Sequence, residues 1–126
     1  MATILVVDDE RPVREFLAAA LEQSGHRVLQ ASHGRHALNM LTDTKPIRLD
    51  LVISDVMMPV LGGVELCCSM KATPATSAIP VILMSAAARH VTIDTCADAY
   101  IAKPFDLDAM DAVVRRMLSV RTKIAS

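Results

Sequence analysis

Short apolar runs rich in β-branched residues alternate along this chain with longer amphipathic stretches, and this alternation limits the fold more than any other feature. Five of the runs have the length and composition of strands, and they cover residues 3–7, 26–31, 49–54, 80–84 and 99–102. Between them, apolar side chains recur at intervals of three and four residues, as on one face of a helix. Strands that alternate with helices predict an α/β fold, in which helices cover both faces of a parallel sheet.

Breaking and capping residues bound the predicted helices. Pro12 suits the first turn of the first helix, which Ser24 and Gly25 end. A second helix opens at His33, and three more are predicted over residues 64–70, 86–94 and 106–120. In the last helix the acidic residues come early and the arginines late, as the helix dipole prefers.

The size and charge of the chain exclude several classes of protein. The 126 residues fit a single domain that spans residues 1–126. Hydrophobic residues make up 52% and charged residues 21%, so disorder is not expected. The net charge of −1 carries no basic surplus that would favour nucleic acid or a membrane surface. No apolar stretch reaches transmembrane length and a signal peptide has no room before the first strand, so we expect a cytoplasmic protein.

The cysteines and two of the histidines predict neither a disulfide framework nor a zinc site. Cys67 and Cys68 are adjacent, and Cys96 makes the number odd, so we expect reduced and mostly packed thiols. His33 and His36 lie three residues apart, but two imidazoles are too few for a typical metal site. We expect them to be exposed polar surface.

Polar side chains stand at the carboxyl ends of four of the predicted strands. Asp8 and Asp9 follow the first strand, Asp55 the third, Ser85 the fourth and Lys103 the fifth. Ligands of open α/β sheets bind beyond these strand ends, so we expect the five side chains to meet at one edge.

Mg²⁺ and a phosphoryl group are the ligands that this set predicts. Three neighbouring carboxylates repel one another, and a hard divalent cation relieves that repulsion. The ammonium of Lys103 and the hydroxyl of Ser85 suit phosphate oxygens. A carboxylate can attack phosphorus to give an acyl phosphate, and phosphoryl transfer depends chiefly on positioning and charge neutralisation.

Four stretches of the sequence resemble the response-regulator receiver domains of two-component signalling, in particular the stand-alone type found in chemotaxis. They are VVDDE, LDLVISDVMMP, IPVILMSA and YIAKPF, and the resemblance covers essentially the whole chain. It implies a flavodoxin-like sheet of five parallel strands in the order 2-1-3-4-5 with helices on both faces.

The resemblance also implies roles for the residues around the phosphoacceptor. Asp55 would be the phosphoacceptor. Asp9 would bind Mg²⁺ directly, Asp8 would act through water, and the backbone carbonyl of Met57 would complete the protein ligands of the metal. In the family, side chains two residues after the phosphoacceptor and two after the hydroxyl residue can orient the hydrolytic water. Here these are Met57 and Ala87, which offer no useful hydrogen bond, so slow autodephosphorylation is expected.

The remaining implied site residues belong to the fourth and fifth strands. Ser85 and Lys103 would hold the phosphoryl oxygens. Ser85 and Tyr100 would form the switch, and the Lys103–Pro104 peptide bond would be cis.

Partners also follow from the resemblance. The phosphoryl group would come from the phosphohistidine of a histidine kinase or a histidine phosphotransfer protein. Output would reach a downstream protein effector through the fourth helix, fifth strand and fifth helix, with the chain a monomer or weak homodimer. Beyond transfer to itself and slow self-dephosphorylation, no enzyme activity is implied.

Three features depart from the family pattern. Gly62 stands where the family often has Asp, and Cys96 stands where Gly commonly precedes the fifth strand. The stretch between Ser85 and Lys103 is shorter than usual by about one helical turn, or roughly four residues. We therefore expect a shortened fourth helix.

Three alternative functions share parts of this pattern. An aspartyl phosphatase of the haloacid-dehalogenase type requires a second Asp, the general acid, two residues after the nucleophile, where this chain has Met57. A flavodoxin-type binder needs hydroxyls and glycines in the first loop, which reads DDERP instead. A receiver-like binding module that is never phosphorylated stays open as the main alternative.

Overall fold

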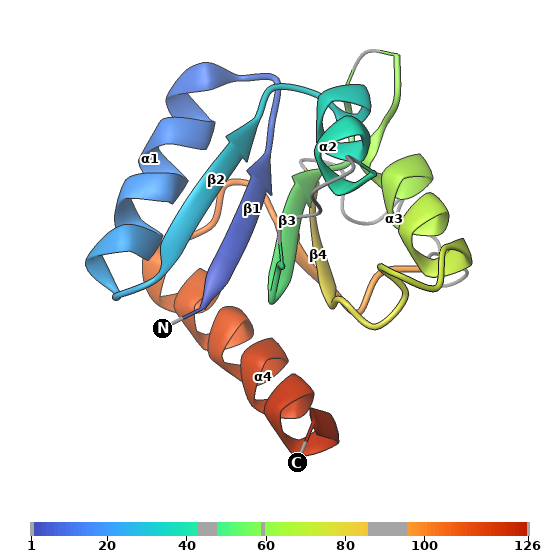
Figure 1. The fold of residues 1–126 in the computed structure, drawn as a ribbon. Coiled ribbons are helices and arrows are strands. Elements are labelled where there is room, and N and C mark those ends of the chain that lie inside the picture. The colour runs from blue at the N-terminus through green and yellow to red at the C-terminus, as the bar shows by residue number, and fades with distance from the viewer. Residues whose placement is uncertain (1, 43–47, 59, 86–95, 126) are drawn as a thin grey trace.

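The computed structural model describes residues 2–42, 48–58, 60–85 and 96–125, with backbone alone for residues 120–125. Strands and helices alternate through most of the chain (Figure 1). In chain order the elements are β1 (Thr3–Val7), α1 (Arg11–Gln23), β2 (Arg27–Ala31), α2 (Gly34–Leu41), β3 (Leu51–Asp55), α3 (Gly63–Ala72), β4 (Val81–Ser85), β5 (Ala99–Ala102) and α4 (Leu107–Ala125).

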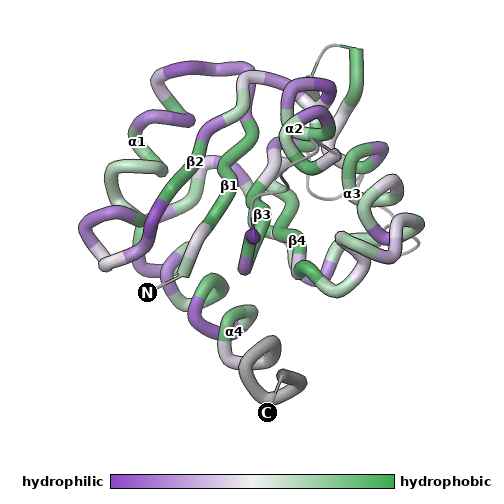
Figure 2. The backbone as a smooth tube through the Cα atoms, in the orientation of Figure 1, coloured by the Kyte–Doolittle hydropathy of each residue, from purple (hydrophilic) through white to green (hydrophobic). Residues whose placement is uncertain are grey.

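The five strands form one parallel sheet in the order β2-β1-β3-β4-β5, which confirms the predicted order. Strands β3 and β4 are buried at every position, as expected of continuous apolar runs covered on both faces. At the edges, β2 and β5 mix exposed and buried residues. In the tube of Figure 2, β1 is largely hydrophobic whereas β2 and α1 change colour along their length.

Helices cover both faces of the sheet, as predicted. On one face α1 and α4 share a core that includes Leu17 of α1 and Met110 of α4. On the other face α2 and α3 share a core that includes Ala37 of α2 and Leu66 of α3. Figure 1 shows the two pairs of helices on opposite sides of the strands. The chain therefore folds as a three-layer sandwich in which aliphatic side chains supply most of the core.

Several boundaries differ from the prediction. Strand β3 includes Asp55, because this residue still pairs in register with Met84 of β4. Helix α4 continues to Ala125, five residues past the predicted end at 120. It begins where the carboxylate of Asp106 accepts a hydrogen bond from the Ala109 amide at 2.6 Å, the geometry of a side-chain cap. The predicted helix over 86–94 lies outside the described residues, so the described part of the chain holds four helices.

The two histidines of the HGRH stretch act locally at the start of α2. The Nδ1 atom of His33 accepts a hydrogen bond from the amide of His36 at 3.0 Å, which caps the helix. The Nδ1 atom of His36 in turn accepts one from the amide of Ser32 at 3.3 Å. His36 is exposed, as expected, while His33 is half-buried. Among the residues described, no helix is both long and apolar enough to cross a bilayer.

Candidate functional site

The polar side chains at the strand ends lie together at one edge of the sheet. Asp8 and Asp9 come directly after β1, and Asp55 is the last residue of β3. Each of these three carboxylates offers an oxygen within 4.8 Å of the others. Lys103, directly after β5, joins them from the far side of β4. The parallel order of the strands thus brings four charged groups to one place from three separate segments.

Lys103 binds two of the carboxylates at once. Its Nζ atom lies 3.0 Å from Oδ2 of Asp8 and 3.2 Å from Oδ1 of Asp55. A longer contact of 4.0 Å reaches Oε1 of Glu10. The side chains of Asp8 and Asp55 are buried, whereas Asp9 is exposed. Buried ion pairs of this kind fix the direction of the lysine, because an unpaired ammonium would be costly there.

The charges in this cluster do not balance. Burial raises the pKa of the Asp55 carboxyl, Lys103 opposes that rise, and the charges of Asp8 and Asp9 add to it. Burial alone would lower the pKa of Lys103, but the hydrogen bond and charge of Asp8, together with the charge of Asp55, raise it overall. Three carboxylates thus face one ammonium, and a further positive charge would stabilise the ionised cluster.

Contacts outside the predicted set hold the first strand end in place. The amide of Glu10 donates to Oδ1 of Asp8 at 2.9 Å, and the guanidinium of Arg14 donates to the backbone oxygen of Asp8 at 2.8 Å. Sequence reasoning missed Arg14. Its place one helical turn after Glu10, whose oxygen accepts from the Arg14 amide, is the signal that could have found it.

Gly63 supports the end of β3 in a way that the sequence did not suggest. A Cβ atom on Gly63 would overlap the backbone carbonyl of Asp55, so only glycine permits the first turn of α3 to lie so close. The hydroxyl of Ser54, also buried, donates to the same carbonyl at 3.0 Å. The backbone of the predicted phosphoacceptor is therefore held by its neighbour and by the start of α3.

The other predicted site residues lie on or near β4 and β5. Ser85 ends β4, is buried, and its backbone oxygen accepts from the Lys103 amide at 3.0 Å. Tyr100 lies on β5 opposite Leu83 and is 37% exposed. The Lys103–Pro104 peptide bond is cis. Met57 is 75% exposed.

The donor set fits a hard divalent cation. Asp8, Asp9 and Asp55 are the single group of three or more potential metal ligands within the described parts of the chain. All three supply carboxylate oxygen, which Mg²⁺ prefers, and neither the cysteines nor the histidines belong to the group.

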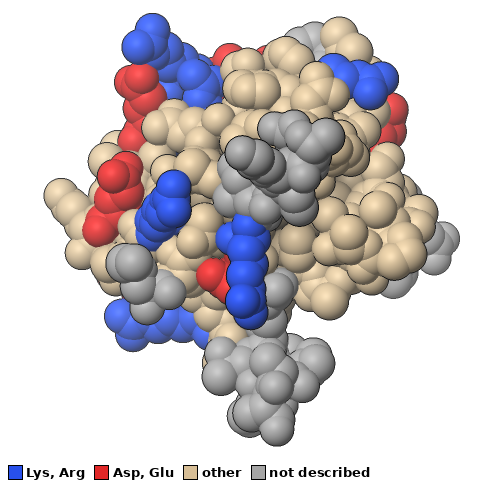
Figure 3. Space-filling view, viewed as in Figure 1, with Lys and Arg blue, Asp and Glu red and all other residues tan. Residues whose placement is uncertain are grey.

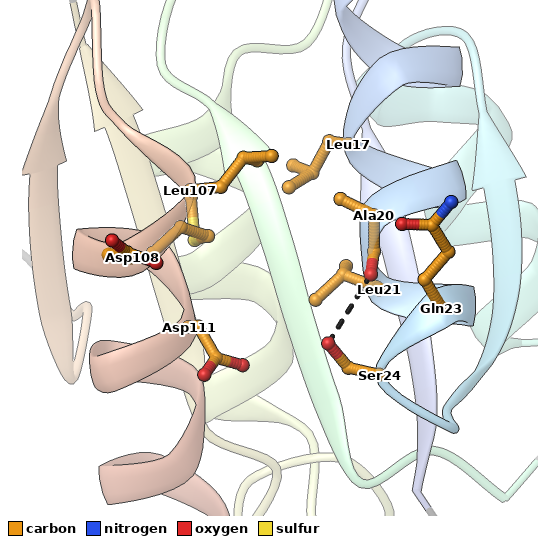
Figure 4. Close-up of a pocket in the computed structure, with 9 residues that line it drawn as sticks. Leu17, Ala20, Leu21, Gln23, Ser24, Leu107, Asp108 and Asp111 are labelled. Atoms are coloured by element: carbon orange, nitrogen blue, oxygen red, sulfur yellow. Dashed lines mark hydrogen bonds between the residues drawn. The ribbon is translucent and has the colours of Figure 1, made fainter.

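Two hollows flank the helices of the α1 side. One, of about 610 Å³, borders Lys103 and is lined mainly by the apolar side chains of Pro12, Val13, Phe16 and Phe105. Phe16 is 59% exposed there. The second, of about 340 Å³, lies between α1 and α4, and Leu107 of α4 points toward Leu17 of α1 there (Figure 4). On the face of Figure 3, acidic and basic side chains are interspersed among larger uncharged areas.

Residues 4–115 match the family model described as the response regulator receiver domain. The phosphate regulon transcriptional regulatory protein PhoB of Pseudomonas aeruginosa is 38% identical over 122 residues, which cover 90% of this chain and 52% of PhoB. The chain spans about half the length of the first curated relatives it matches.

Solved structures match the fold over nearly the whole chain. The receiver domain of a signal transduction histidine kinase from Syntrophus aciditrophicus superposes with a TM-score of 0.82 at 35% identity, covering 94% of this chain and 91% of that one. The response regulator TrrA of Thermotoga maritima, solved in complex with Mg²⁺-BeF, has a TM-score of 0.82 at 30% identity, with coverage of 93% and 99%.

Proposed function

This chain belongs to the response regulator receiver domain family, and from that premise we propose that it takes a phosphoryl group onto Asp55 with the help of Mg²⁺. The observation that carries the proposal is the contact of one ammonium, that of Lys103, with both Asp8 and Asp55 inside a group of three carboxylates. We propose further that residues 1–126 form one receiver domain, because the described strands build a single sheet.

The residues of the chain divide the chemistry between them. A carboxylate oxygen of Asp55 attacks the phosphorus of a phosphohistidine, the O–P bond forms, and the N–P bond breaks as histidine leaves. Oδ1 of Asp55 contacts Lys103, which leaves Oδ2 as the better placed nucleophile. Lys103 then moves its contacts to the phosphoryl oxygens, and Ser85 adds its hydroxyl as a donor.

The metal would be bound directly by Asp9, Asp55 and the backbone carbonyl of Met57. Asp8 would contact it through a water molecule. The exposure of Asp9 supports this division, since Asp8 is buried and already bound to Lys103. When bound, Mg²⁺ supplies positive charge against the carboxylates and the phosphoryl oxygens. The complex of the relative TrrA with Mg²⁺-BeF is in keeping with this assignment.

A protein that carries a phosphohistidine is the proposed donor, either a histidine kinase or a histidine phosphotransfer protein. The apolar hollow beside Lys103, with its exposed Phe16, offers this donor a surface next to the reacting carboxylate. We propose that the phosphorylated chain changes its affinity for a downstream protein effector through β5 and the flanking helices. A cytoplasmic location accords with the three free thiols.

Intact mass measurement after treatment with acetyl phosphate and Mg²⁺ tests this function. Wild-type protein should gain the mass of one phosphoryl group, and Asp55→Asn should gain none. Asp108→Asn, on the exposed start of α4, is the matched control and should label like wild type. Labelling of Asp55→Asn to the wild-type extent would overturn the assignment. A wild-type protein that neither binds Mg²⁺ nor labels would favour the unphosphorylated binding module instead.

A further inference from the structure

Two cysteines that are far apart in sequence meet between α3 and the segment that leads into β5. The thiol of Cys96 donates to Sγ of Cys68, and the two sulfur atoms are 2.8 Å apart. Cys68 is exposed and Cys96 is half-buried, so small molecules in solvent can reach the pair. The expectation that the thiols are mostly packed is therefore wrong for Cys68. Neither residue belongs to the carboxylate site.

We propose that Cys68 and Cys96 are a redox site, at which a low-molecular-weight disulfide oxidises the two thiols to an intramolecular disulfide. The Cys68 thiolate attacks one sulfur of the external disulfide, forms a mixed disulfide with it and releases one thiolate. The Cys96 thiolate then attacks Sγ of Cys68 and releases the second. Two protein thiols are oxidised, the external disulfide is reduced to two thiols, and both protons pass to the released thiolates and solvent.

Polar contacts hold this part of the chain against α3. Nζ of Lys71, on α3, lies 3.0 Å from Oδ2 of Asp98, two residues after Cys96, and donates to the backbone oxygen of Ile79 at 2.9 Å. The same Asp98 oxygen accepts from the amide of Val81 at 2.8 Å. These contacts hold the segment before β5 against α3, and the two sulfur atoms therefore lie close together. A disulfide has an S–S length of about 2.0 Å, so the sulfurs need to approach by only about 0.8 Å.

The third cysteine is excluded from this chemistry by its position. Cys67 precedes Cys68 on α3 but points into the core and has no exposed surface. Burial raises the pKa of its thiol to about 12, and a disulfide in solvent cannot reach a side chain with no exposed surface. Cys67 therefore serves as an internal reference for selective oxidation.

Oxidation would also restrain the strand that carries Tyr100. Cys96 lies four residues before Tyr100, whose pKa is raised first by burial and then by the nearby thiols of Cys67 and Cys96. A disulfide excludes every conformation in which the segment before β5 moves away from α3. This consequence rests on the proposed function: if phosphorylation shifts β5 relative to α3, the disulfide must oppose it.

Thiol counting on the full chain tests the redox site without any phosphorylation. The protein is treated with oxidised glutathione, denatured and alkylated, and its intact mass is measured. All three cysteines should be alkylated in reduced protein and only Cys67 in oxidised protein, with dithiothreitol restoring the full number. Cys67→Ser is the matched control and should still lose both remaining thiols. Cys68→Ser and Cys96→Ser should form no internal disulfide.

Three results would overturn the redox site. They are full alkylation after oxidation, a stable glutathione adduct on Cys68 beside a free Cys96, and a covalent dimer on a non-reducing gel.

The link to phosphorylation is tested by titrating reduced and oxidised protein with beryllofluoride and Mg²⁺. We expect about fivefold or weaker binding by the oxidised form. Equal affinities would refute the link while the thiol count still decides the redox site. No binding by the reduced form would instead contradict the proposed function.

Discussion

Asp55 carries a charge that the fold itself disfavours. Burial and the charges of Asp8 and Asp9 raise its pKa, although Lys103 pulls in the opposite direction. A carboxyl whose pKa is higher in the folded than in the unfolded state stabilises the fold only while it is protonated. That stability is complete below the unfolded pKa of about 3.9 and is lost as the pH rises through the folded pKa. The proposed phosphoacceptor thus lowers the stability of the metal-free fold at neutral pH.

Asp55→Asn is therefore expected to raise the melting temperature of the metal-free protein at neutral pH. The amide keeps the shape of the carboxyl and removes the disfavoured charge. The difference from wild type should shrink as the pH falls and vanish below about 3.9, where Asp55 becomes protonated in both states. Thermal unfolding in the presence of a chelator measures this, with Asp108→Asn as an exposed control. A lower melting temperature for Asp55→Asn would contradict the electrostatic account.

Asp8 and Asp9 are adjacent in sequence but should differ in their effect on Mg²⁺ binding. Asp9 is exposed, whereas Asp8 is buried and bound to both Lys103 and the amide of Glu10. We expect Asp8→Ala to weaken Mg²⁺ binding by about tenfold, as loss of an outer-sphere partner does, and Asp9→Ala to weaken it further. Titration calorimetry measures both. Equal affinities for wild type and the two variants would rule out the metal site.

Met57 predicts a long-lived phosphorylated form. Its exposed thioether cannot orient a water molecule for attack on the acyl phosphate. Met57→Asn should restore a polar group and speed the loss of the phosphoryl group by about tenfold, or about 1.4 kcal/mol of barrier. Met57→Leu keeps the position apolar and should leave the rate unchanged. Decay of the phosphorylated protein after removal of the donor is the measurement, and equal decay of all three proteins would refute the argument. Ala87, the second position invoked for this water, lies outside the described residues.

The start of α3 determines how the end of β3 is held. Gly63 brings the first turn of the helix against the carbonyl of Asp55, and a methyl group there would collide with it. Gly63→Ala should lower the free energy of unfolding by about 1–3 kcal/mol, the usual cost of overpacking a tight site. Urea denaturation measures the effect. Asn39→Ala, on the exposed face of α2, should stay within about 0.5 kcal/mol of wild type. Equal stability of Gly63→Ala and wild type would show that the helix can move aside.

The edge strand β5 differs from the central strands in the exposure of its side chains. Strands β3 and β4 have helices over both faces, so their sequences are apolar except at their carboxyl ends. On β5, Ile101 packs toward α4 while Tyr100 points to the opposite face and is partly exposed. An exposed aromatic side chain on an edge strand has room to change its orientation, as the proposed switch requires.

The conformational change caused by phosphorylation should be transmitted through β5. Lys103 contacts Asp55 on one side of the sheet and follows directly after the strand that carries Tyr100. Addition of beryllofluoride and Mg²⁺ should therefore change amide hydrogen exchange most between Ser85 and Lys103. Wild type and Asp55→Asn are compared with and without the mimic, and the variant should show no change. Protection differences confined to α1 and β2 would count against a switch at this strand.

The sequence by itself determined the class of fold and the polar residues that share one edge of the sheet. Apolar runs that alternate with helical periodicity leave few arrangements other than a covered parallel sheet. In such a sheet the residues after each strand must share an edge, and Asp8, Asp55 and Lys103 do so. The strand order came from the resemblance to receiver domains, because strand patterns alone do not specify which strands are neighbours.

Only the tertiary structure decided which groups touch and how deeply they lie. Lys103 pairs with Asp8 and Asp55, while the adjacent Asp9 stays exposed. The need for glycine at position 63 and the meeting of Cys68 with Cys96 were equally hidden. Each depends on how closely two separate segments approach, and sequence patterns report the face on which a side chain lies but not its distance from another element.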